Sequence, residues 1–203
     1  HASYRRQRQM CIRDRGMAIA EKILASKINT EKIKPVDHRT YCFVGDGCLM
    51  EGISHEVMSL AGVLELNKLI CFYDSNGISI DGEIKEWYKD DIELRCKSYG
   101  WNVIGEIDGH NRDEINQAIV AAKQSNKPTM IVCKTSIGYG AGSKQDSESS
   151  HGSPLGEEVL TELRKNLDWE YQPFEIPESV YADWDFKEKG KNLEENWKAI
   201  CAD

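Results

Sequence analysis

The sequence predicts an α/β domain with a mostly parallel sheet and helices on both faces of that sheet. Short apolar runs alternate with segments of helical period, and the first two runs end in glycine and polar residues. This alternation is typical of strand–helix–strand units, whose right-handed crossovers place helices on both sides of a sheet. The composition agrees with a folded domain, because 40% of the 203 residues are hydrophobic and 30% are charged.

The first fifteen residues differ from the rest of the chain. Five of them are arginine, and no helical or strand period is sustained. We therefore expect residues 1–15 to form an atypical basic segment that is disordered or non-native. Organised sequence begins at Gly16, where apolar residues interspersed with Glu21 and Lys22 predict a short amphipathic helix.

A strand–helix–strand unit follows the linker around Pro35. The apolar run that starts at Tyr41 predicts a buried strand ending at the Gly-Asp-Gly sequence of residues 45–47. The next segment predicts a helix, because its apolar residues fall on one helical face: Ile53, Val57, Leu60, Ala61 and Leu64. Residues 68–73 predict a second buried strand, which ends in the polar sequence 74–77.

The alternation continues to the end of the domain. The pattern predicts helices over residues 91–99 and 113–124, and strands over residues 102–107 and 129–134. A long loop rich in Gly and Ser then leads to a helix over residues 155–167. We place the α/β domain at residues 16–167. Residues 168–203, rich in aromatic side chains, are expected to lie over the domain as an extension and to lead toward a second domain.

Composition and charge argue against several classes of protein. The net charge of −8, from 26 basic and 34 acidic side chains, argues against a general nucleic-acid surface. An arginine-rich start leaves nucleic-acid binding as a weak alternative. No apolar run is long enough to cross a membrane. The seven cysteines show no Cys-x-x-Cys spacing, which favours reduced thiols, so we expect a cytoplasmic protein.

Two consecutive strand ends carry the polar residues that a divalent cation and a phosphate require. Asp46 follows one strand and Asn76 follows the next, one strand–helix–strand step further along the chain. Ligands of open parallel sheets bind outside the carboxyl ends of the strands. Mg²⁺ prefers oxygen ligands, and Gly45 and Gly47 let backbone N–H groups approach a phosphate. Although either motif alone is equally typical of a turn, together they predict a metal-bridged diphosphate site.

Longer strings around these motifs resemble one family. Gly-Asp-Gly followed by Asn76 resembles the thiamine diphosphate motif, and the strings 45–56 (GDGCLMEGISHE) and 72–82 (FYDSNGISIDG) resemble transketolases of the bacterial type. Four shorter strings add to the resemblance: 16–22 (GMAIAEK), 107–110 (IDGH), 133–135 (CKT) and 150–156 (SHGSPLG). The resemblance covers the chain from Gly16 nearly to its end.

The resemblance implies roles for individual residues. It implies that Mg²⁺, or another divalent cation such as Ca²⁺, is held by three groups: the Asp46 carboxylate, the Asn76 side chain and the Ile78 carbonyl. It implies that thiamine diphosphate is contacted by six residues: Gly45, Gly47, Asn76, Ile80, Lys134 and His151. His151 would also reach the substrate, and Glu51 would belong to a catalytic carboxylate network near a dimer interface.

The resemblance also implies an activity. Transketolases transfer a two-carbon ketol unit from a ketose phosphate to an aldose phosphate in the pentose phosphate pathway, as homodimers that act on sugar phosphates. Other residues that the family requires are not identifiable in this chain, so we expect it to be inactive alone. Dihydroxyacetone synthase and deoxyxylulose-phosphate synthase remain alternatives, as does a non-catalytic module that binds a phosphate or a partner chain.

Overall fold

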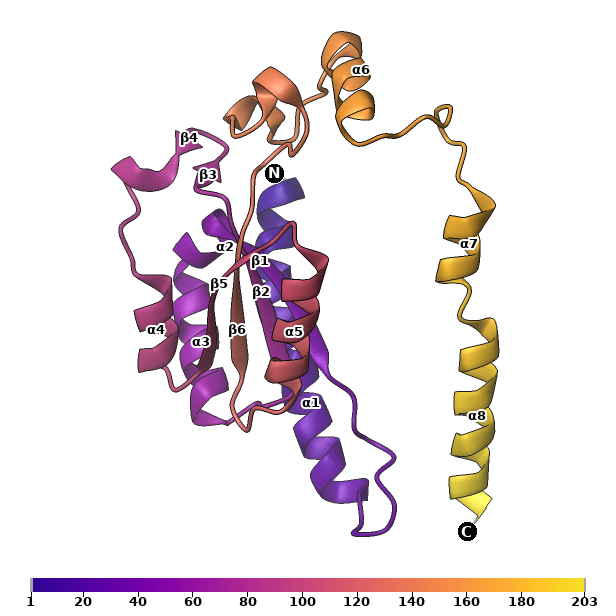
Figure 1. The fold of residues 1–203 in the computed structure, drawn as a ribbon. Helices are drawn as coiled ribbons and strands as arrows, with labels where there is room; N and C mark the ends of the chain where they lie inside the picture. Colours follow the sequence, from indigo (N-terminus) through magenta and orange to yellow (C-terminus); the bar gives the residue numbers. More distant parts are fainter. Residues whose placement is uncertain (1, 203) are drawn as a thin grey trace.

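The computed structural model describes residues 2–202, with side chains described over residues 13–200. Its centre is a four-stranded sheet (Figure 1). In spatial order the strands are β1 (Thr40–Gly45), β2 (Leu69–Ser75), β6 (Thr129–Lys134) and β5 (Asn102–Asp108). All neighbouring pairs are parallel, which confirms the predicted sheet. The register places Gly45 of β1 beside Asp74 of β2, so these two strands end at the same level.

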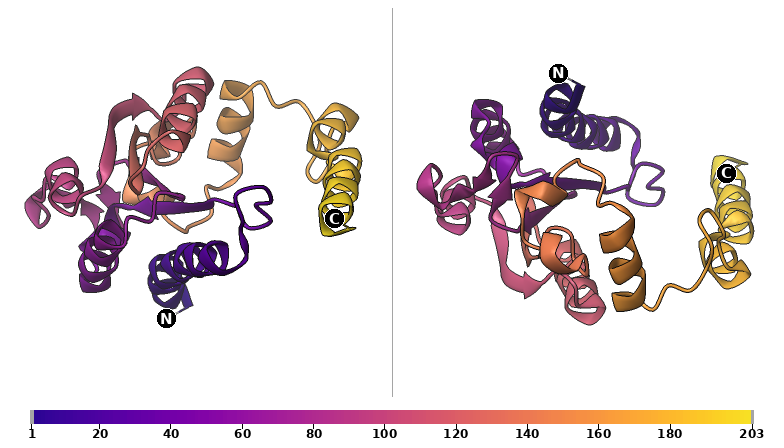
Figure 2. Two further views of the ribbon diagram at one scale, coloured as in Figure 1. Left: turned by 90° about the horizontal axis from the view of Figure 1, so that it is seen from below. Right: turned by 90° about the horizontal axis from the view of Figure 1, so that it is seen from above.

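Helices cover both faces of the sheet, as predicted (Figure 2). On one face lie α1 (Ala2–Ile28), α3 (Gly52–Val63) and α4 (Ile92–Ser98), and on the other lies α5 (Arg112–Lys123). Alternate residues of each strand point to opposite faces. The first face buries Cys42, Val44, Cys71, Tyr73, Met130 and Val132, and the second buries Ile70, Phe72, Ile131 and Cys133.

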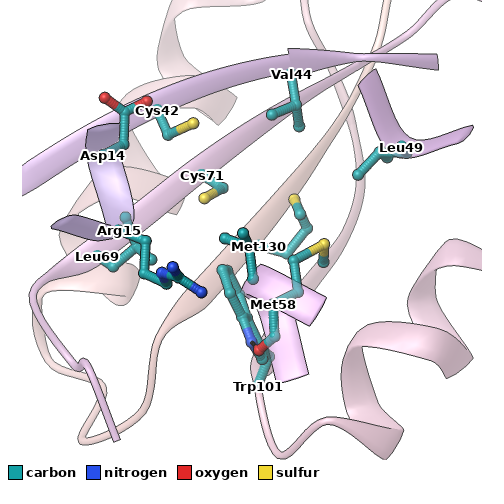
Figure 3. Close-up of a pocket in the computed structure, with 11 residues that line it drawn as sticks. Asp14, Arg15, Cys42, Val44, Leu49, Met58, Leu69, Cys71, Trp101 and Met130 are labelled. Carbon is teal, nitrogen blue, oxygen red and sulfur yellow. Dashed lines mark hydrogen bonds between the residues drawn. The ribbon is translucent and has the colours of Figure 1, made fainter. Parts of the chain in front are cut away.

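A small cavity of about 20 Å³ lies between the first face and its helices. Figure 3 shows Met58, Trp101 and Met130 in its wall, with Cys42 and Cys71 close together on neighbouring strands. These two cysteines are register partners, and the Cys71 thiol together with burial raises the pKa of Cys42 far above its usual range. A thiol with a raised pKa is a poor nucleophile, so Cys42 acts here as a small core side chain.

Helix α1 starts earlier than the sequence pattern predicts. Residues 2–15 are helical and continuous with the expected helix after Gly16. The structure thus gives residues 2–15 as helix rather than as a disordered segment, and the alternative that they are non-native stays a prediction; His1 lies outside the described residues. Arginine, glutamine and methionine have high helix propensity, which favours a helix even where apolar residues do not recur with a helical period. A search for that period alone therefore does not detect this part of the helix. The division of the chain at residues 15 and 167 stays a prediction.

A partly buried ion pair connects α1 to the start of β2. Lys68, just before β2, lies 2.5 Å from Glu21 of α1 and 2.7 Å from Asp37. The hydrogen bond from Lys68 lowers the pKa of Asp37, whose carboxylate is mostly exposed. Glu21 is only 4% exposed, so its charge depends on Lys68 for compensation.

Several short elements were not predicted from the sequence. Helix α2 (Asp46–Met50) directly follows β1, and a small antiparallel pair, β3 (Ile78–Ser79) with β4 (Gly82–Glu83), follows β2. Three short 3₁₀ turns occur at η1 (Ile84–Glu86), η2 (Gly142–Lys144) and η3 (Glu148–Ser150). Elements of this size carry too few residues for a period to be recognised.

The C-terminal extension does not lie over the domain, which corrects that expectation. After α6 (Glu157–Asn166), the chain leads to α7 (Glu178–Trp184) and α8 (Lys187–Ala202), which stand apart from the sheet (Figure 1). Every side chain from residue 181 to 200 is exposed. Of the helices that the structure describes, none is both long and apolar enough to span a bilayer.

Two polar caps fix where the predicted helices begin. Asp91 accepts a hydrogen bond from the Leu94 N–H at the start of α4, with a distance of 2.9 Å. Asn111 accepts from the N–H groups of Asp113 and Glu114 at the start of α5. These caps satisfy N–H groups that have no partner within the helix.

We predict that Gly62→Ala destabilises the protein. A Cβ atom at Gly62 of α3 would lie 1.7 Å from the Tyr99 carbonyl oxygen, which is backbone and cannot rotate away. The gain in helix propensity is about 1 kcal/mol, whereas overpacking costs about 1–3 kcal/mol and more where backbone must move. Urea unfolding should show a free energy of unfolding lower by about 2 kcal/mol.

Gly52→Ala in the same helix is the matched control. A Cβ atom at Gly52 would meet nothing within 4 Å. The free energy of unfolding should stay unchanged or rise slightly. Equal effects of the two substitutions would contradict close packing of α3 against the turn after α4.

Candidate functional site

A cavity of about 610 Å³ opens at the carboxyl ends of the parallel strands. This volume falls in the ordinary range of small-molecule sites. Every strand of the sheet contributes to its wall through the segment that follows the strand. Its lining consists of Gly45, Asp46, Gly47, Cys48, Asp74, Asn76, Ile78, Ser79, Ile80, His110, Thr135, Ser136, Ile137, Gly138 and His151.

The Asp46 carboxylate joins the two loop tips that the sequence singled out. Asp46 is the first residue of α2 and is only 3% exposed. Its Oδ2 atom accepts a hydrogen bond from the Gly77 N–H at 2.9 Å, next to Asn76. The two strand ends therefore meet, as the spacing predicts.

The other Asp46 oxygen is held by Tyr73. The Tyr73 hydroxyl donates to Asp46 Oδ1, and Tyr73 lies within β2 at 5% exposure. Burial, followed by the hydrogen bond to Asp46, raises the pKa of Tyr73 far above its ordinary value. The hydroxyl therefore stays protonated at neutral pH and remains a donor, which fixes the orientation of the carboxylate.

The Asn76 turn presents further oxygen atoms at the same place. Asn76 Oδ1 accepts from the Ile78 N–H at 2.9 Å, and Asn76 Nδ2 donates to Asp74 Oδ1 at 3.2 Å. This side-chain turn fixes the amide so that its oxygen and its nitrogen are distinguishable. Ile78 itself is buried and lines the cavity.

These groups fit a hard divalent cation. Asp46 accepts hydrogen bonds from Tyr73 and Gly77, and both of these donors are neutral. Neither donor therefore supplies a positive charge to compensate the buried carboxylate of Asp46. Over the described residues, no group of three or more His, Cys, Asp or Glu side chains could hold a metal. A cation here would combine one carboxylate with amide, carbonyl, phosphate and water oxygens, the set that Mg²⁺ prefers.

The remaining predicted residues divide into two groups. Gly45, Gly47, Ile80 and His151 line the cavity, and a Cβ atom at Gly45 would meet nothing within 4 Å. Lys134 and Glu51 do not line it. Lys134 is exposed at the end of β6, and half-buried Glu51 lies between α2 and α3, where its carbonyl accepts from the Ser54 hydroxyl. The roles of both stay predictions.

Several residues of the cavity wall were assigned no binding role from the sequence. Asp74 Oδ1 also accepts from the Thr135 hydroxyl, which links the ends of β2 and β6. His110 Nε2 accepts from the Ser136 N–H at 3.0 Å, and its ring stacks on Tyr139 at 4.0 Å between centroids. Asp74, His110 and Thr135 lie at or just after strand ends, so the rule that identified Asp46 could have found them.

The chain is similar to transketolases along nearly its whole length. Residues 9–203 match the family described as "Transketolase, thiamine diphosphate binding domain". A transketolase from Buchnera aphidicola is 54% identical over 183 residues, covering 90% of this chain and 28% of that relative.

Solved structures give the same result. A transketolase structure from Leishmania mexicana matches with a TM-score of 0.90 and 37% identity, covering 96% of this chain and 29% of that one. A transketolase from Pichia stipitis, solved in complex with sedoheptulose 7-phosphate, matches with a TM-score of 0.89 and 35% identity over the same shares.

The chain spans less than a third of the length of the relatives it matches. The matched part includes both loop tips that meet at Asp46. The family match over residues 9–203, together with the parallel-sheet fold, establishes that this chain belongs to the transketolase family, as its thiamine diphosphate-binding N-terminal domain.

Proposed function

We propose that this chain is the thiamine diphosphate- and Mg²⁺-binding part of a transketolase. Together with the rest of a longer polypeptide it would transfer a two-carbon ketol unit from a ketose phosphate to an aldose phosphate. The observation that carries the proposal is the contact between Asp46 and Gly77, which brings the carboxylate beside the Asn76 turn at the cavity.

The cation would be held by three oxygen atoms of this chain. The Asp46 carboxylate would supply a full negative charge, and Asn76 Oδ1 and the Ile78 carbonyl would supply neutral oxygens. Tyr73 would keep Asp46 oriented through Oδ1, and Oδ2, which also accepts from the Gly77 N–H, would face the ion. Phosphate oxygens and water would complete the coordination, because Mg²⁺ usually retains such ligands.

The cavity wall supports binding of the cofactor. Bound thiamine diphosphate would supply the chemistry that breaks and forms the carbon–carbon bond. Gly45 and Gly47 leave room for the diphosphate, and Ile80, which is 66% exposed, offers an apolar surface. His151, exposed at the rim, could hydrogen-bond both the cofactor and a sugar phosphate.

Substrates and partners follow from the family. The Pichia stipitis relative was solved with sedoheptulose 7-phosphate, which supports sugar phosphates as substrates here. We propose that Glu51 acts in a carboxylate network at a homodimer interface, and that Lys134 reaches the diphosphate from the end of β6. The pentose phosphate pathway and the cytoplasmic location remain parts of this proposal.

Asp46→Asn should abolish cation-dependent binding of the cofactor. The substitution keeps the size of the side chain but removes the only full charge among the proposed ligands. Titration calorimetry with thiamine diphosphate and Mg²⁺ should show an affinity lower by about 100-fold or more, since even outer partners of a metal site cost about 10–100-fold. Chelation of Mg²⁺ should have the same effect on the unmodified chain.

Asp183→Asn, on exposed α7, is the matched control and should bind like the unmodified chain. Binding that survives both Asp46→Asn and chelation would point to a different phosphate site and contradict the proposal.

Tyr73→Phe should weaken Mg²⁺ binding while the fold is retained. Loss of the hydroxyl leaves Asp46 Oδ1 without its donor, so the carboxylate is no longer held in one orientation. Calorimetry should show an affinity for Mg²⁺ lower by about 10-fold. Tyr99→Phe removes a hydroxyl that bonds His55 instead, and it should leave the affinity unchanged. An equal loss in both variants would contradict the role of Tyr73.

The chain alone should show no transketolase turnover. It covers 28% of a relative's length, and the resemblance to transketolases implies further catalytic groups that are not identifiable in these residues. A mixture with xylulose 5-phosphate, ribose 5-phosphate, thiamine diphosphate and Mg²⁺ should yield no sedoheptulose 7-phosphate by mass spectrometry. A full-length relative is the positive control, and product formed by this chain would overturn the expectation.

A further inference from the structure

We propose that Lys144 is a positioning residue for His151. Its ammonium group and its carbonyl oxygen together hold the His151 loop, defined as residues 145–155, at the wall of the cavity. The inference deepens the proposed function, because His151 is the side chain proposed to reach the cofactor and the substrate.

The His151 loop has little regular structure of its own. Apart from η3, no helix or strand is assigned between residues 145 and 155. Gly152 has a φ of 75°, and a Cβ atom there would meet nothing within 4 Å. Residues 151–154 are all exposed. The position of His151 therefore depends on specific contacts rather than on burial.

Lys144 makes those contacts on both sides of His151. Its Nζ donates to the Leu155 carbonyl at 2.9 Å and to the Pro154 carbonyl at 3.4 Å. Its own carbonyl accepts from the hydroxyl of Ser150, the residue before His151. Lys144 therefore hydrogen-bonds to residues on both sides of His151.

The closed loop rests directly on the cavity wall. A Cβ atom at Gly138 would lie 2.6 Å from Ser150 Oγ and 3.3 Å from the Lys144 carbonyl oxygen. Gly138 lines the cavity, and the Asp146 N–H donates to the neighbouring Ile137 carbonyl at 2.9 Å. Lys144 and Ser150 therefore lie against Gly138, a residue of the same cavity wall that His151 lines.

A lysine suits this role chemically. Its ammonium group carries three donors on a flexible stem, so it can serve two carbonyl oxygens at once. Methionine has a similar unbranched stem and no donor, whereas arginine restores donors in a different geometry. Comparing these two substitutions separates the hydrogen bonds from the packing of the stem.

The first experiment measures the loop without any cofactor. Hydrogen–deuterium exchange should show that Lys144→Met accelerates exchange over residues 145–155 by about tenfold, with residues 40–75 unchanged. The NMR signal of the His151 imidazole should move toward that of free histidine. Lys144→Arg should restore both readouts at least in part, and Lys85→Met, at an exposed lysine, should match the unmodified chain.

The second experiment measures binding of thiamine diphosphate with Mg²⁺. Lys144→Met should lower the affinity by about tenfold, the size expected for groups that orient a ligand. Should the unmodified chain fail to bind, the proposed function fails, while the exchange data still decide the role of Lys144.

An unchanged His151 signal and unchanged loop exchange in Lys144→Met would overturn the inference. So would accelerated exchange spread equally over residues 40–75, because that result indicates general destabilisation.

Discussion

The candidate site is organised around one buried side chain, the carboxylate of Asp46. A carboxylate at 3% exposure is costly unless hydrogen bonds and an opposite charge compensate it. Tyr73 and Gly77 supply two hydrogen bonds, and both come from the β2 side of the site. The parallel register that pairs Gly45 with Asp74 brings them within reach. Both donors are neutral, so the charge of the carboxylate has no opposite charge among its hydrogen-bond partners, and the proposed cation would supply one.

The rest of the cavity is built by the same topology. Segments after β2, β5 and β6 reach one edge, where Asp74 bonds Thr135 and His110 bonds Ser136. The chain beyond β6 is anchored in turn by α6, because Asn166 donates to the Gly140 carbonyl at 2.8 Å. The strands therefore position the end of the site that carries Asp46, and a loop held by side-chain hydrogen bonds positions the end that carries His151. This division is common in α/β proteins, where loops on a fixed scaffold carry function.

The local sequence pattern predicted the alternating strands and helices of the domain and the two loop tips that carry Asp46 and Asn76. Apolar runs located the four strands of the sheet, and glycine and polar residues after two of them located Asp46 and Asn76. Contacts between distant positions could not be predicted in this way: neither the Tyr73 hydroxyl on Asp46 nor the Thr135 hydroxyl on Asp74 leaves a local signal. The predicted start of helix α1 was too late in the chain, because residues 2–15 have helix propensity but no apolar period. The exposed α7, which carries Tyr181 and Trp184, shows that aromatic content alone does not determine where a segment packs.

The most direct measurement is the anomalous scattering of Mn²⁺, as a substitute for Mg²⁺, in crystals grown with thiamine diphosphate. The account predicts one strong peak in the cavity, at about 2.0–2.4 Å from Asp46 Oδ2, Asn76 Oδ1 and the Ile78 carbonyl oxygen. A peak elsewhere, or cofactor density in the cavity with the Asp46–Gly77 hydrogen bond intact and no ion beside it, would contradict the account.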